Sequence, residues 1–99
     1  MSKDQKFQYF MGVVEVEYSK EEDGDTYYGS KKVNCLTKAL KKNDDIDFQV
    51  IRSIQNNAHS LLLGMLNDEK AVIVNSTVLN IIRCGYMKDE EFKLNEQLH

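Results

Sequence analysis

The sequence predicts a small α+β domain, in which an antiparallel sheet made of an N-terminal hairpin and C-terminal strands carries one or two helices. Two β-rich stretches near the ends of the chain and a segment of helical spacing between them support this fold class. The 99 residues are 41% apolar and 29% charged, an ordinary globular composition with material for one core. We therefore expect residues 1–99 to form a single domain, with 88–99 as a mobile C-terminal tail.

The most regular strand pattern covers residues 7–18. Val14, Val16 and Tyr18 alternate with glutamates, which predicts a strand with one buried and one solvated face. Residues 9–13 are apolar on both sides, a pattern typical of a central strand. This stretch is the first strand of the predicted hairpin.

A turn and a short helix are predicted next. Gly24 lies between two aspartates, which is turn chemistry, and leads into a second strand over 26–33. Asn34 is placed to cap a helix over 35–42, because four apolar side chains fall at helical spacing, namely Val33, Leu36, Ala39 and Leu40.

Residues 46–66 fit two templates. As a helix, the segment places an apolar residue every fourth position, and the aspartates before it would cap its start: Ile46, Val50, Ile54, Ala58 and Leu62. As strands, the first half alternates between apolar and polar residues and is rich in β-branched side chains. The β-branched residues favour a strand over 46–54, and the second half suits either state.

The C-terminal third predicts two more strands. The run AVIVN, residues 71–75, is uniformly apolar, which predicts a strand covered on both faces. Residues 76–79 would form a turn or helical corner, and 80–87 would return as a further strand. A helix starting at Ser76 is the alternative. The polar tail after it would be a frayed helix or an arm that is ordered only when bound.

The sequence also indicates the cell compartment and the state of the cysteines. The start of the chain shows no signal-peptide pattern, and no apolar run approaches the roughly 20 residues that span a bilayer, so we expect a cytoplasmic protein without membrane contact. Cys35 and Cys84 form no Cys-x-x-Cys pair and are expected to be reduced, buried thiols. The net charge of -3 indicates no particular partner.

No arrangement typical of catalysis or metal binding occurs. The chain has two histidines, His59 and His99, and neither lies in a recognisable motif. The acidic run at residues 21–25 lacks the spacing of a calcium loop. The five glycines are isolated and form no phosphate-binding loop. We therefore predict no enzymatic activity, no metal and no cofactor.

The predicted hairpin concentrates tyrosines beside lysines, and tyrosine is enriched in protein interfaces. We predict that the chain binds a protein partner through the hairpin, with contributions from the acidic tail, and that it forms a homo-oligomer, which would help a small domain to bury apolar area. The candidate binding residues are Tyr18, Tyr27, Tyr28, Lys31 and Lys32.

The alternative is a nucleic-acid or nucleotide binder. Residues 31–42 carry five lysines and no acid, and aromatic side chains beside cations can stack bases and neutralise phosphates: Lys31, Lys32, Lys38, Lys41 and Lys42. The general character, a short lysine- and aspartate-rich domain without catalytic motifs, resembles that of accessory proteins of phages and mobile elements. This resemblance implies a regulatory or inhibitory module that blocks an enzyme or sequesters a ligand.

Overall fold

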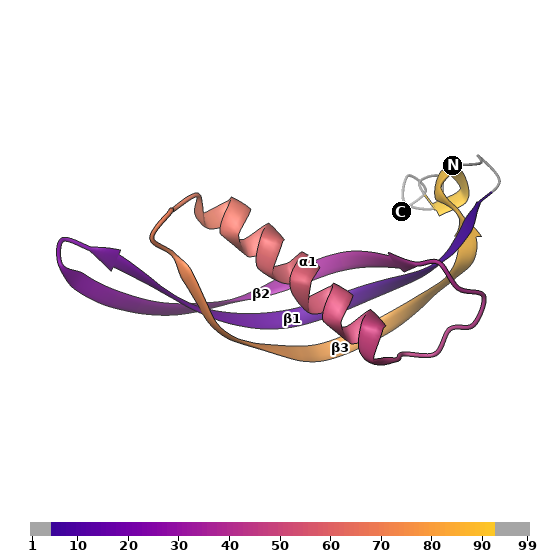
Figure 1. Cartoon of the computed structure of the whole chain (residues 1–99), viewed down its shortest axis with the longest axis horizontal. Coiled ribbons are helices and arrows are strands. Elements are labelled where there is room, and N and C mark those ends of the chain that lie inside the picture. The colour runs from indigo at the N-terminus through magenta and orange to yellow at the C-terminus, as the bar shows by residue number, and fades with distance from the viewer. Residues whose placement is uncertain (1–4, 93–99) are drawn as a thin grey trace.

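A computed structural model of the chain describes residues 5–92 (Figure 1). Three long antiparallel strands and one long helix follow in the order β1 (Lys6–Glu22), β2 (Asp25–Ala39), α1 (Phe48–Leu66) and β3 (Val72–Lys88). A short helical turn over 89–92 closes the described part. The sheet order is β2-β1-β3, so the predicted α+β class and the central place of β1 are confirmed.

The β1–β2 hairpin is unusually regular. Its register runs from Gln8 opposite Ala39 to Glu22 opposite Asp25 without a shift. Asp23 and Gly24 form the two-residue loop, with φ of 54° and 85°. Positive φ at both positions is the geometry of the type I′ turn, for which Asp-Gly is a preferred pair, so the predicted turn is confirmed.

The β1–β3 pairing differs, because β3 contains more residues than the part of β1 that it faces. The register shifts three times, and each shift leaves one residue of β3 without a direct partner: Val74, Leu79 and Cys84. These β-bulges are five residues apart and increase the local twist of β3. The strand nevertheless continues through residues 76–79, so the predicted turn or helical start there is wrong.

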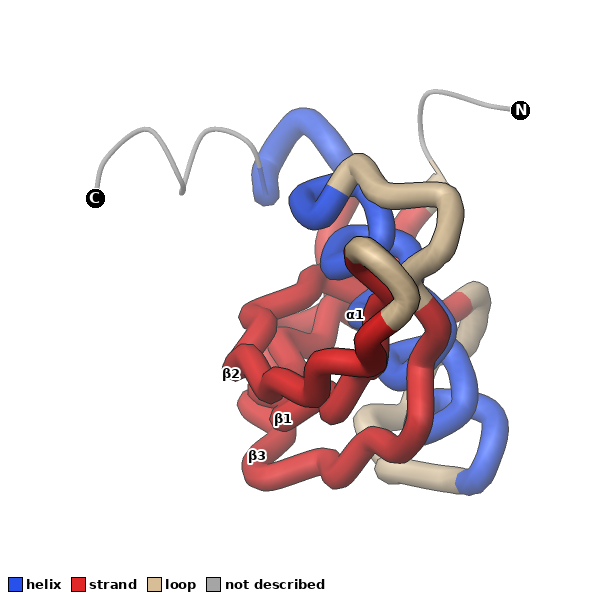
Figure 2. Tube along the Cα trace, turned by 90° about the vertical axis from the view of Figure 1, so that its left-hand side faces the viewer, coloured by secondary structure: helices blue, strands red, loops and turns tan. Residues whose placement is uncertain are grey.

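Helix α1 covers one face of the sheet, as Figure 2 shows from the end of the molecule. The Asp47 side chain caps its first turn by accepting a hydrogen bond from Val50 N at 3.0 Å. A buried stripe at every fourth helical position packs on the strands: Val50, Ile54, Ala58 and Leu62. The strands contribute the other half of the core, namely Phe10, Val14, Val16, Val33 and Cys35.

The predicted strand over 46–54 is therefore wrong, and the helical alternative is correct. The β-branched residues Val50 and Ile54 are fully or almost fully buried beneath the helix. Burial of the four-residue stripe outweighs their modest preference for strands, because the propensity difference is only a few tenths of a kcal/mol per residue.

The predicted helix over 35–42 is also wrong, because β2 continues to Ala39. Val33, Cys35 and Thr37 are buried, and the residues between them are exposed. That period of two is the pattern of a strand with one covered face. The helical spacing of Leu36, Ala39 and Leu40 in the sequence was coincidental.

The AVIVN run is part of a strand, as predicted, but it is not covered on both faces. Val72 and Val74 are 58% and 55% exposed, because β3 forms an edge of the sheet and only one helix covers one face. In the expected tail, Lys88 belongs to β3 and 89–92 are helical. Residues 93–99 lie outside the described residues.

Candidate functional site

The hairpin extends beyond the rest of the fold. The β3 pairing ends at Ser19 opposite Val72, whereas β1 and β2 continue to pair up to the turn. We call residues 18–32 the hairpin arm. Its tip projects past both α1 and β3 at the left of Figure 1, so its backbone pairs on one side only. The arm holds all five predicted binding residues.

The three tyrosines of the arm do not share one face. Tyr18 lies opposite Gly29 on the side that carries α1, and a Cβ added at Gly29 would lie 2.7 Å from Tyr18 Cζ. The Tyr18 ring thus covers the glycine, as aromatic residues do beside strand glycines. Tyr27, 50% exposed, shares the Tyr18 side, and Tyr28, 77% exposed, points to the opposite side.

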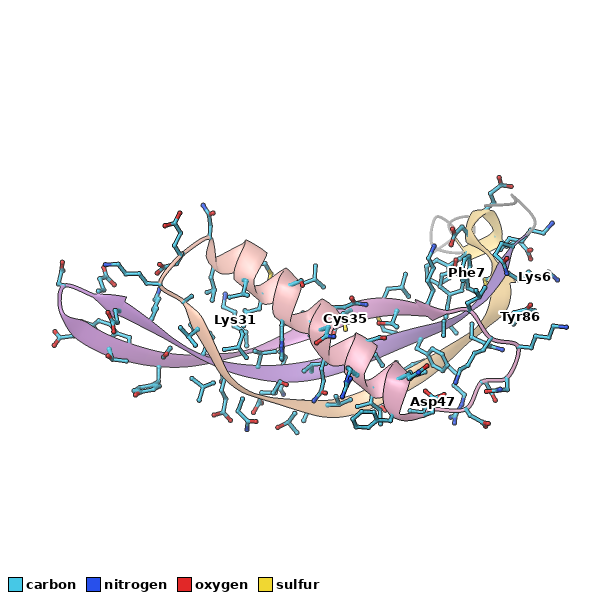
Figure 3. All side chains as sticks on the ribbon, viewed as in Figure 1. Lys6, Phe7, Lys31, Cys35, Asp47 and Tyr86 are labelled. Atoms are coloured by element: carbon cyan, nitrogen blue, oxygen red, sulfur yellow. The ribbon has the colours of Figure 1, made fainter. Side chains whose placement is uncertain are left out.

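The lysines are likewise divided. Lys31 lies opposite Val16 on the helix-bearing side (Figure 3). Lys32 lies opposite Glu15 on the other side. Further along the chain, Lys38 forms an ion pair with Asp89 at 3.0 Å and Lys41 one with Asp47 at 3.0 Å. The sequence therefore suggested a continuous basic segment that the structure does not bring together on one surface.

The face of the sheet opposite α1 carries an apolar patch that no other element of residues 5–92 covers. The register aligns Leu36, Met11 and Ile82 in one row across the three strands, with Asn34, Val13 and Asn80 in the next. Leu36 is 36% and Ile82 is 49% exposed. Towards the arm, the rows become polar and charged and end at Tyr28. We call this surface the open face.

The open face was missed at the sequence level, because no local signal marks it. Its apolar row combines one residue from each of three strands, so it appears only once the register is known. Along β2, buried and exposed residues alternate from Val33 to Lys38. This alternation is the pattern that could have indicated a strand here instead of a helix.

The C-terminal turn covers the other end of the open face. The Phe92 ring stacks on Tyr9 with a centroid distance of 4.4 Å and an interplanar angle of 8°. The Tyr9 hydroxyl donates to Asp89, which also pairs with Lys38. Burial and the carboxylate of Asp89 raise the pKa of Tyr9 well above its usual range. A cavity of about 520 Å³ opens beside this cluster, towards Ser53 and Asn57 of α1.

The metal-binding side chains of the described residues are dispersed, and both cysteine thiols are poorly ionised. Between residues 5 and 92, no three side chains of the metal-binding types converge. Burial raises the pKa of both cysteine thiols, which lowers the thiolate fraction that a nucleophile requires. The Cys35 thiol instead donates to the Ile54 carbonyl oxygen at 3.3 Å inside the core. His59 lies on α1, and its Nε2 is buried without a hydrogen-bond partner among the described residues.

Comparison with known proteins adds no function. A scan against protein-family models finds no match, and searches for similar curated proteins and similar solved structures find none either. Among the described residues, α1 is the long helix, and it is too polar to cross a membrane. The hairpin arm and the open face are the two surfaces of the described residues that could bind a partner.

Proposed function

We propose that this protein is a non-catalytic binding module of regulatory or inhibitory type, which recognises a folded protein partner through the open face. The observation that supports this proposal is the apolar row of Leu36, Met11 and Ile82 on the face of the sheet opposite α1, where no other element of the described residues covers it. Apolar side chains surrounded by polar ones are typical of protein interfaces.

The surroundings of this row favour a protein over a nucleic acid. Glu15 and Glu17 lie on the open face, and Lys32 lies directly opposite Glu15. Lys38 and Lys41 are already paired with carboxylates of the chain. A phosphate backbone would meet few unpaired cations here, whereas an apolar surface of a protein would bury the row without electrostatic cost. Nucleic-acid binding through the lysines of residues 31–42 is the alternative.

The experiment is capture of partners from an extract of the native cells by the immobilised, tagged chain, followed by mass spectrometry. The test variant carries Leu36→Asp and Ile82→Asp on the open face. Its matched control carries Leu40→Asp and Phe48→Asp, at positions that are 72% and 68% exposed and lie outside the sheet. Both variants gain the same charge and lose two exposed apolar side chains.

The proposal predicts at least a tenfold loss of the captured protein with the open-face variant and no loss with the control, because an uncompensated buried charge weakens an interface strongly. Circular dichroism establishes that both variants are folded. Equal capture by the two variants, or capture of nucleic acid alone, would contradict the proposal.

A further inference from the structure

The two edges of the sheet differ in how well they could accept another strand. Strand β3 carries bulges at Val74, Leu79 and Cys84, which twist an edge and interrupt its hydrogen-bonding pattern. Strand β2 pairs with β1 over its whole length without a shift, so its outer edge presents a regular series of backbone groups. A regular, unpaired edge is a template for strand addition.

One hydrogen bond shows which residues of β2 direct their backbone N–H and C=O groups away from β1. The Leu36 carbonyl oxygen accepts a hydrogen bond from Asn57 Nδ2 at 3.2 Å, so this carbonyl faces away from β1. Because peptide groups alternate along a regular strand, the even-numbered residues of β2 direct their N–H and C=O groups to the free edge. On the hairpin arm these are Thr26, Tyr28, Ser30 and Lys32.

The charges along this edge are self-complementary. The tip of the arm is acidic, with Asp23 and Asp25, and its base is basic, with Lys31 and Lys32. If two such edges run antiparallel about a two-fold axis at Tyr28, Asp25 of each copy lies directly opposite Lys31 of the other. The overlap then covers residues 24–32 and ends before Leu36, where Asn57 already occupies the edge.

We propose that two copies of this chain pair through the β2 edges of their hairpin arms, antiparallel about Tyr28, and form one continuous six-stranded sheet. A two-fold interface requires a self-complementary surface, and the acidic tip and basic base provide one. The axis is perpendicular to the sheet, so both open faces lie on the same side and form a single doubled surface. The inference thereby extends the proposed function, on which the role of that surface rests.

The test is a charge exchange read out as oligomeric state by analytical ultracentrifugation. Asp25→Lys places a lysine at position 25 of each copy opposite Lys31 of the other copy. Lys31→Glu places a glutamate at position 31 of each copy opposite Asp25 of the other copy. Each single variant is expected to dimerise at least about tenfold more weakly than the parent chain, since like charges directly opposite are destabilising. The double variant restores both pairs and is expected to regain the dimer.

An equimolar mixture of the two single variants is expected to form heterodimers, because each chain then supplies the complement of the other. Glu21→Lys is the matched control: it makes the same kind of charge change on β1 of the arm, away from the β2 edge, and should leave the dimer intact. As a second readout, Tyr28→Cys in a Cys84→Ser background should form an intermolecular disulfide, because paired residues on the axis lie within bridging distance.

A parent chain that sediments as a monomer at all concentrations would overturn the inference, as would a double variant no more dimeric than the single variants. These changes leave Leu36 and Ile82 intact, so the capture experiment reads the open face independently. If the parent chain is a monomer and still captures its partner through the open face, only the self-pairing is contradicted. If the parent chain is a dimer and its open-face variant captures the partner normally, only the proposed function is contradicted.

Discussion

Gly12 lies on the central strand directly beneath Ile54 of α1, and it provides a sharp test of the packing. A Cβ at this position would lie 2.3 Å from Ile54 Cγ2 and 3.3 Å from Ile54 Cγ1. Carbon atoms in contact are normally about 3.5–4.0 Å apart, so Gly12→Ala produces an overlap of more than about 1 Å. Ile54 is completely buried, and β1 is held by strands on both sides, so neither partner can move freely.

We expect Gly12→Ala to lower the free energy of unfolding by about 3 kcal/mol, at the upper end for an overpacked core. For a domain of this size, the melting temperature would fall by about 12–24 °C. Gly64→Ala is the matched control. Gly64 is exposed on α1 with nothing within 4 Å of the added Cβ, so alanine should stabilise the helix there by about 0.5–1 kcal/mol.

A double-mutant cycle tests the contact between Gly12 and Ile54, with unfolding in urea monitored by circular dichroism. Ile54→Ala removes both γ carbons and leaves Ile54 Cβ at 3.4 Å from the new methyl group, an ordinary contact. Alone it should cost about 2–5 kcal/mol. In combination with Gly12→Ala, the total should be at least about 1 kcal/mol smaller than the sum of the single effects. Strict additivity, or a harmless Gly12→Ala, would refute the close approach of β1 and α1.

Two further predictions concern single hydrogen-bonded groups. Tyr9→Phe keeps the ring that stacks on Phe92 but removes the hydroxyl that donates to Asp89, so it should destabilise the fold by about 1–2 kcal/mol in urea titrations; an unchanged midpoint would contradict the contact. The hydrogen bond from Val50 N and the Lys41 ammonium lower the pKa of the Asp47 carboxyl in the folded protein. Its ionised form therefore stabilises the fold at pH values above the ordinary aspartate pKa of about 4. This stabilisation is lost as the pH falls through the lower pKa of the folded state. The melting temperature of Asp47→Asn should therefore be below that of the parent at neutral pH and converge with it on acidification, and a constant difference would contradict the pairing.

The parts of the fold that the sequence predicted are those with a local cause. The Val14 and Val16 alternation marked β1, and the Asp-Gly pair marked the turn, because both depend on residues close together in the chain. The helix over 48–66 was assigned half to a strand because Val50 and Ile54 are β-branched, whereas its burial against the sheet decides its state.

The candidate site was only partly predictable for a related reason. The hairpin and its tyrosines followed from local patterns, so the predicted residues are indeed on the hairpin arm. That Tyr27 and Tyr28 point to opposite sides depends on the register with β1. The open face depends in addition on β3, whose three bulges shift every later residue by one position and have no clear sequence signal.

We propose that this protein meets its partner on the open face. Hydroxyl-radical footprinting of the complex captured from the native extract, compared with the free chain, tests it most directly. We expect oxidation of Met11, Leu36 and Ile82 to fall at least threefold in the complex, while that of Leu40 and Phe48 stays unchanged. Protection of Leu40 and Phe48 with full oxidation across the open face would contradict the claim.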